Sequence, residues 1–310
     1  MRPVRHVRPG SVYEITTRSI DRTLLLRPSK EVNQIILGVI GRAQEKTGVK
    51  IYALVFMSTH YHMLIGSAGA DQTAKFVGMV NCNITRKLNA LNDRTGSGWS
   101  RRFFSILIAN DRASQERRLR YLLAHGVKER LVARAQDWPG ASTLPWLVSG
   151  KPIRGVWTSF TDRYYARLRK GYVSKPGQFD TVYELQMSVL PCWRRLATPD
   201  WRTLVAEMVA EIEAEEAARC FEEHGIALED RVLGVQAVLA AEPLGRLGRQ
   251  KRSRAPSVHA VCRVVRKFSQ EELRLLREAY AEASHRFRAK EWDVAFPEGT
   301  FRPGGGFVAG

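Results

Sequence analysis

Two short apolar segments, residues 50–57 and 61–66, constrain the fold of this chain more than any other feature. Both are rich in β-branched and aromatic residues, which is typical of buried strands, and the short Ser58-Thr59 corner joins them. His60 lies directly before the second segment and His62 at its start. Because side chains alternate along a strand, both imidazoles point to the same face of the sheet. They either hold one divalent ion together or are two satisfied histidines at the end of a sheet.

The remaining elements of the first half predict an α+β fold. Strands are expected at residues 11–18 and 103–109, and helices at 30–46, from about 71 to 91, and from Asp111 onward. The order β-α-β-β-α-β-α is the ferredoxin-like split β-α-β plan, an antiparallel four-stranded sheet with helices on one face. Ser29 and Gly48 are expected to limit the first helix, and Asp71 or Thr73 to cap the second.

Residues 146–310 are expected to form a mostly α-helical accessory region, separate from a domain at 1–145. Apolar periodicity predicts helices over 201–224 and 232–241, and a capping box of Ser269 and Glu272 predicts a third that runs to about 289. Residues 246–257 are a basic linker or a nucleic-acid-contacting arm. In the segment 153–174, Tyr164-Tyr165 lies among arginines. The pair suits stacking on unpaired bases, but we favour aromatic packing on the core.

The charge of the chain favours a polyanionic partner. The formal net charge is +18, and residues 1–150 carry 23 Lys/Arg against 10 Asp/Glu, compared with 26 against 21 in residues 151–310. DNA or RNA is the first candidate for such a basic half, and a merely soluble basic protein is the alternative. Four scattered cysteines predict no disulfide. Without an apolar signal core or membrane span, the protein is expected in the cytoplasm and not in a membrane.

Tyr121 lies in a cationic helix segment suited to phosphate chemistry. Arg117 and Arg118 precede it by four and three residues and His125 follows it by four, so all share one helix face. The arginines can hold a phosphodiester and favour the phenolate. The alternative is that Tyr121 is an amphipathic core residue.

The ordered series YALVFMSTHYHMLI, WSRRFFSILI, RYLLAHGVKERLV and DWPGAS resembles the single-tyrosine HUH transposases, and most of all the group associated with repeated extragenic palindromes. The opening RHVRPGSVYEITTRS is similar to the N-terminal strand of that group. The resemblance covers about residues 1–145. It implies that His60 and His62 are metal ligands and that Tyr121 is the nucleophile. His125 stands where a polar residue completes the metal site, and His125-Gly126 replaces the asparagine-proline pair usual in the group.

The resemblance further implies an enzyme that cuts and rejoins single-stranded DNA at hairpin-flanked sites. The expected reaction is metal-assisted transesterification through a 5′-phosphotyrosine, with Mg²⁺ or Mn²⁺ as cofactor. Histidine at position 125 shifts the preference toward Mn²⁺ or another softer ion. Single-stranded or hairpin DNA is the expected partner, and the oligomeric state, monomer or homodimer, stays open. Candidate DNA contacts are Arg5, Arg8, Arg101, Arg102, Arg117 and Arg118.

Two alternatives remain beside the transposase. One is a catalytically decayed or domesticated module that binds structured DNA or RNA. The other is a metal-dependent hydrolase, which would need a carboxylate close to the histidines, and residues 51–70 contain no Asp or Glu.

Overall fold

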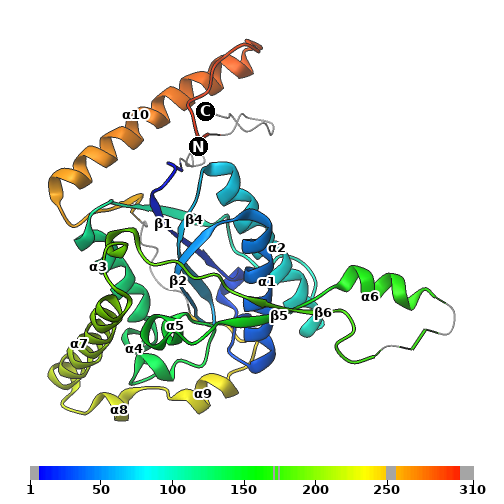
Figure 1. The fold of residues 1–310 in the computed structure, drawn as a ribbon, viewed down its shortest axis with the longest axis vertical. Helices are drawn as coiled ribbons and strands as arrows, with labels where there is room; N and C mark the ends of the chain where they lie inside the picture. The colour runs from blue at the N-terminus through cyan, green and yellow to red at the C-terminus, as the bar shows by residue number, and fades with distance from the viewer. Residues whose placement is uncertain (1–6, 170–171, 174, 249–255, 301–310) are drawn as a thin grey trace.

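The computed structural model describes residues 7–169, 172–173, 175–248 and 256–300 (Figure 1). A mixed sheet lies at its centre, with strands in the order β2-β3-β1-β4-β7. The first four are β1 (Val12–Arg18), β2 (Lys50–Phe56), β3 (His60–Gly66) and β4 (Phe104–Ile108), and all their pairings are antiparallel. This is the strand order of the predicted ferredoxin-like plan, and the α+β class is confirmed.

Of the two helices of that plan, the first begins and ends as predicted and the second begins earlier than predicted. Helix α1 (Lys30–Thr47) follows the prediction at both ends. The Ser29 hydroxyl accepts a hydrogen bond from the Val32 amide at 3.1 Å, and Gly48 ends the helix in the left-handed conformation, with φ 69°. Helix α2 (Ala70–Leu91) starts earlier than predicted, with Gly69 at the N-cap position. The predicted capping role of Asp71 or Thr73 is therefore wrong: Asp71 lies in the first turn and pairs with Lys75.

Helices cover both faces of the sheet, and only one of those faces was expected to be covered. Odd-numbered residues of β1 and β3, such as Ile15 and Met63, pack with α1 and α2. Even-numbered residues, such as Val12 and Leu64, pack with α3 (Arg112–Leu123) and α7 (Thr198–His224). Helix α3 is capped as predicted, since Asp111 accepts the Ser114 amide at 2.8 Å. The side chains of His60 and His62 therefore lie on the α3 face.

The chain beyond α3 contributes helices, a hairpin and a short fifth strand of the central sheet. These elements are α4 (His125–Lys128), α5 (Leu144–Ser149), β5 (Arg154–Thr158), α6 (Phe160–Arg167), β6 (Asp180–Glu184), α8 (Leu228–Arg231), α9 (Val235–Ala240), β7 (Val258–His259) and α10 (Arg263–Arg288). The described residues also form three short 3₁₀ helices, Ile20–Arg22, Ala135–Asp137 and Pro191–Trp193. None of the helices that the structure describes is long and apolar enough to cross a lipid bilayer.

Two C-terminal predictions are wrong. Ser269 and Glu272 form no capping box, because α10 begins at Arg263, and Glu272 instead lies 3.1 Å from Arg8. Tyr164 and Tyr165 do not pack on the core: they are 60% and 61% exposed on α6. Most of the predicted basic linker, residues 249–255, lies outside the described residues.

Candidate active site

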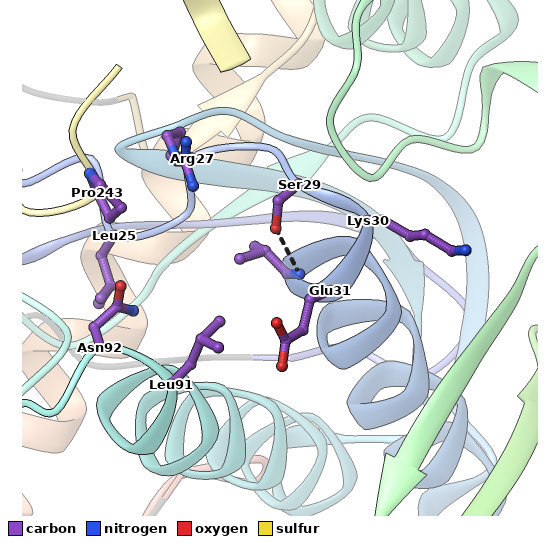
Figure 2. A pocket seen from close by; sticks show the side chains of 9 residues that line it. Leu25, Arg27, Ser29, Lys30, Glu31, Leu91, Asn92 and Pro243 are labelled. Carbon is purple, nitrogen blue, oxygen red and sulfur yellow. Dashed lines mark hydrogen bonds between the residues drawn. The ribbon is translucent and has the colours of Figure 1, made fainter. Parts of the chain in front are cut away.

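The candidate active site lies between β3 and α3. A pocket of about 450 Å³ at the start of α1, lined by Leu25, Arg27, Ser29 and Leu91 among others, contains none of the predicted site residues (Figure 2). The histidines and the tyrosine instead gather on the sheet face that α3 covers. The candidate site is thus built from packed side chains of three elements, β3, α3 and α4.

Three imidazoles form a compact cluster. His60 and His62 come from β3, and His125 comes from the first residue of α4. One ring nitrogen from each lies within 4.8 Å of the others, and all three side chains are buried. Within the described residues this is the one histidine, cysteine or carboxylate group with the spacing of a metal site.

Each imidazole is oriented by a second contact at its Nδ1 atom. His62 Nδ1 lies 2.5 Å from the Glu14 carboxylate, and His125 Nδ1 lies 2.8 Å from the Tyr121 carbonyl. His60 Nδ1 lies 3.1 Å from the Thr59 hydroxyl. Because carboxylate and carbonyl oxygens only accept, Nδ1 of His62 and of His125 donates the proton. Nε2 of each is then free for a metal, as in metal sites whose histidines are held by outer partners.

Burial favours the neutral form of two of the three imidazoles, His60 and His125. It lowers the pKa of His125 to about 3, with the charge of His62 as the next cause, and it lowers the pKa of His60 well below its usual value. A neutral imidazole is the form that binds a metal, so at neutral pH no proton has to leave His60 or His125. The donor set is three nitrogens without a carboxylate oxygen, which suits Mn²⁺ or another transition metal better than Mg²⁺.

Tyr121 lies beside this cluster. Its ring centroid is 4.7 Å from that of His125 and 5.6 Å from that of His62. The Arg118 guanidinium lies 4.1 Å above the ring. Burial raises the pKa of the Tyr121 phenol, and the nearby charge of Arg118 offsets only part of this effect. Arg118 thus favours the phenolate, as predicted, but burial outweighs its effect on the pKa of Tyr121.

Glu14 joins the metal cluster to the tyrosine, and the sequence reasoning missed it. One carboxylate oxygen contacts His62 and the other pairs with Arg118, while the side chain is fully buried. Burial alone would raise the pKa of Glu14, but the hydrogen bonds and charges of His62 and Arg118 lower it below the usual value. The signal was available in residues 11–18, where a charged residue stands on the face of a strand that Val12 also uses.

The presence of Glu14 corrects one argument made from the sequence. A carboxylate does lie next to the histidines, although residues 51–70 contain none. It comes from β1, where Thr16 is opposite His62 and Glu14 is the diagonal neighbour. Both of its oxygens are already bound by His62 and Arg118, so it holds these residues in place and is not a free base.

The predicted DNA contacts differ in their surroundings. Arg118 was predicted to contact DNA. Its side chain is only 12% exposed and is held by Glu14 and Tyr121, so it is not free to bind a phosphate in this arrangement. Arg8 pairs with Glu272 at 3.1 Å. Arg101, Arg102 and Arg117 are exposed, and Arg5 lies outside the described residues. The Arg101-Arg102 pair directly follows Ser100, whose backbone amide donates a hydrogen bond to the Arg18 carbonyl. Arg18 is the strand partner of His60, so the two arginines lie at the end of the sheet that carries the candidate site.

Comparison with known proteins identifies the domain that carries this site. Residues 11–122 match the family model "Transposase IS200 like". Over these residues the chain is similar to the IS200-like transposases. The matched range contains His60, His62 and Tyr121 and ends three residues before His125, so the third imidazole of the cluster lies outside it.

Two solved structures are similar to the transposase domain. One is a REP-associated tyrosine transposase bound to a REP hairpin, 22% identical over 45% of this chain and 79% of its own, with a TM-score of 0.39. The other is a putative transposase from Deinococcus radiodurans, 16% identical over 37% of this chain and 89% of its own, with a TM-score of 0.28. No curated protein matches the chain.

The contact between Glu14 and His62 leads to a prediction about metal binding. Glu14→Gln keeps the shape of the side chain but removes the charge that holds the His62 Nδ1 proton and Arg118. We expect the affinity for Mn²⁺ to fall about 10- to 100-fold, the usual effect of losing an outer partner of a metal-bound histidine. Calorimetric titration with Mn²⁺ measures the change. Glu116→Gln, on α3 but in contact with Trp193 and Arg112 instead of the histidines, is the matched control. Equal affinities in the two variants would contradict the role of Glu14.

Proposed function

We propose that this protein is a transposase that cuts and rejoins single-stranded DNA at hairpin-flanked sites through a 5′-phosphotyrosine on Tyr121. The observation that supports the proposal most is the meeting of Tyr121 with His60, His62 and His125 in an IS200-like domain. A tyrosine hydroxyl beside three buried imidazoles combines a nucleophile with a metal site. That combination suits phosphoryl transfer better than simple binding.

We infer that His60, His62 and His125 would hold one divalent ion, and that the donor set favours Mn²⁺ over Mg²⁺. When bound, such an ion supplies positive charge that stabilises the oxygens of a phosphodiester under attack. Thr59, Glu14 and the Tyr121 carbonyl orient the three rings before any ion arrives. Little of the free energy of metal binding is therefore needed to orient the three imidazoles.

Tyr121 performs the covalent step. Its oxygen forms a bond to the phosphorus, the bond from phosphorus to the 3′-oxygen breaks, and the phenol proton is balanced by the proton gained at the 3′-hydroxyl. A 3′-hydroxyl of a second strand reverses the step and joins the ends, so no nucleotide triphosphate is consumed. Arg118, stacked on the ring and paired with Glu14, fixes the direction of the phenol.

We also propose which residues contact the DNA and which part of the chain cuts it. Arg101, Arg102 and Arg117 are exposed near the site and are proposed to bind the DNA backbone. We propose that residues 1–145 form the DNA-cutting domain and that residues 146–310 are an accessory region. In support, α7 packs on the α3 face from outside and covers the helix that carries Tyr121.

The test is a denaturing gel for a covalent protein–DNA complex. Labelled single-stranded DNA from the flanks of the gene is incubated with the full chain and Mn²⁺, Mg²⁺ or EDTA. We expect a covalent complex with Mn²⁺, a weaker signal with Mg²⁺, and none with EDTA. Tight binding without any covalent complex in either ion would contradict the proposal and favour a module that only binds structured nucleic acid.

A further inference from the structure

A two-stranded arm leaves the body of the molecule at residues 154–184. Strands β5 and β6 pair antiparallel from Arg154 opposite Glu184 to Thr158 opposite Asp180, and α6 lies beyond them. Figure 1 shows this hairpin crossing α1 and carrying α6 well away from the sheet. None of it belongs to the matched transposase range, which ends at residue 122.

The base of the arm is fixed rigidly. Gly38 of α1 and Gly155 of β5 let the two backbones touch, since a Cβ atom on Gly38 would lie 2.1 Å from the Val156 carbonyl oxygen. Lys87 of α2 donates to the Thr158 carbonyl at 2.5 Å and lies 4.2 Å from the rings of Trp157 and Phe160. The chain thus uses a buried lysine and two glycines to hold the arm in one direction.

The outer end of the arm exposes aromatic and apolar side chains. Tyr164, Tyr165 and Leu168 are 60%, 61% and 65% exposed, whereas Ala166 between them is buried. The two tyrosine rings lie 5.5 Å apart and nearly perpendicular to each other. A cluster of exposed rings on a rigid projection costs solubility and typically marks a binding surface.

The charges around these rings are uncompensated. Arg167 and Arg169 are exposed and form no ion pair with the residues that the structure describes. Several surface arginines elsewhere are instead paired with carboxylates, as in the pairs Arg112–Glu116, Arg120–Glu215 and Arg274–Glu278. A protein partner with an apolar surface would not require this excess of positive charge, but a polyanion would.

We propose that the outer end of the arm binds unpaired DNA, with Tyr164 and Tyr165 stacking on bases and Arg167 and Arg169 contacting phosphates. Aromatic rings interleaved with arginines are the usual platform for single strands. The proposal rests on the proposed function only in taking single-stranded DNA as the substrate. Because the arm is anchored on the α1–α2 face and Tyr121 lies on the α3 face, the arm holds a different stretch of strand from the one that is cut.

Fluorescence anisotropy on the full chain tests this inference. The probes are a labelled 20-nucleotide oligothymidine and a 20-base-pair duplex. Tyr164→Ala/Tyr165→Ala is expected to weaken binding of the single strand about tenfold or more, because each stacked base contributes appreciably, and to leave duplex binding within about twofold. Arg167→Ala/Arg169→Ala is expected to weaken both and to lower the salt slope for the single strand by about 1.4.

Two control variants separate stacking from other effects. Tyr164→Phe/Tyr165→Phe keeps the rings and should bind as the unmodified protein does, and Phe221→Ala removes an equally exposed ring from the acidic helix α7. Failure of the unmodified protein to bind oligothymidine would overturn the proposal. Unchanged binding by the double alanine variant, or an equal loss for the duplex, would do the same. These readouts need no cleavage, so they are independent of whether Tyr121 forms a covalent complex.

Discussion

Tyr121→Phe is expected to abolish the covalent protein–DNA complex while leaving DNA binding within about twofold of the unmodified protein. The phenyl ring keeps its contacts with Arg118 and His125, and within the described residues the lost hydroxyl makes no hydrogen bond. The fold and the metal cluster should therefore survive the change. Removing the attacking group of an enzyme typically lowers the rate by at least about 10³-fold, so the complex should disappear from a denaturing gel.

The matched control for Tyr121 is the pair Tyr164→Phe and Tyr165→Phe. These tyrosines were the rival nucleophiles in the sequence, and their hydroxyls are solvent-exposed on α6, whereas the metal cluster lies on the α3 face. Their phenylalanine variants should form the complex at the normal rate. A Tyr121→Phe protein that still forms the complex, or a complex lost only in the α6 variants, would move the nucleophile to the arm and reject the proposed site.

His62→Ala is expected to have the second-largest effect, with a loss of Mn²⁺ affinity of more than about 100-fold. The loss exceeds that of an outer partner because the ring itself is removed from the cluster. His62 lies closest to His125, with ring centroids 4.3 Å apart, and 5.1 Å from His60. Glu14 keeps its pair with Arg118 in the variant, so no buried charge is left without a partner.

Calorimetric titration with Mn²⁺ and the gel assay together measure the His62→Ala effect. His285→Ala removes an exposed imidazole from α10 and should change neither readout. Unchanged Mn²⁺ affinity in His62→Ala would reject the three-histidine site. If the variant loses its affinity for Mn²⁺ but still forms the covalent complex at the normal level, the covalent step does not require the metal.

The local pattern of the chain predicted most of the sheet and both of its first helices. Alternation placed His60 and His62 on one face, and Ser29, Gly48 and Asp111 marked helix ends through their own side chains or backbone conformation. The same reasoning failed where residues far away in the sequence determine the contacts of a side chain. Ser269 looks like a helix cap in isolation, but its helix already begins at Arg263, and the Glu272 carboxylate that would complete the capping box pairs with Arg8.

The candidate site was predictable residue by residue but not in its connections. Tyr121 and His125 are four residues apart on a helical segment, and their proximity follows from helix geometry alone. The link through Glu14 depends on the pairing of β1 with β3, which brings residues 48 positions apart into contact. Exposure of Tyr164 and Tyr165 likewise depends on the hairpin that lifts α6 away from the core, and periodicity within α6 carries no information about it.

Strand β7 has a consequence for how the protein is made. It pairs in parallel with β4, at Leu107–Val258 and Ile108–His259, and so covers the C-terminal end of the β4 edge. These partners are separated by about 150 residues, which a ribosome adds in roughly ten to thirty seconds. During that interval the nascent chain presents the apolar β4 edge without its partner, and an open edge pairs readily with other strands. Newly synthesised protein is therefore most prone to aggregate before its last fifth emerges.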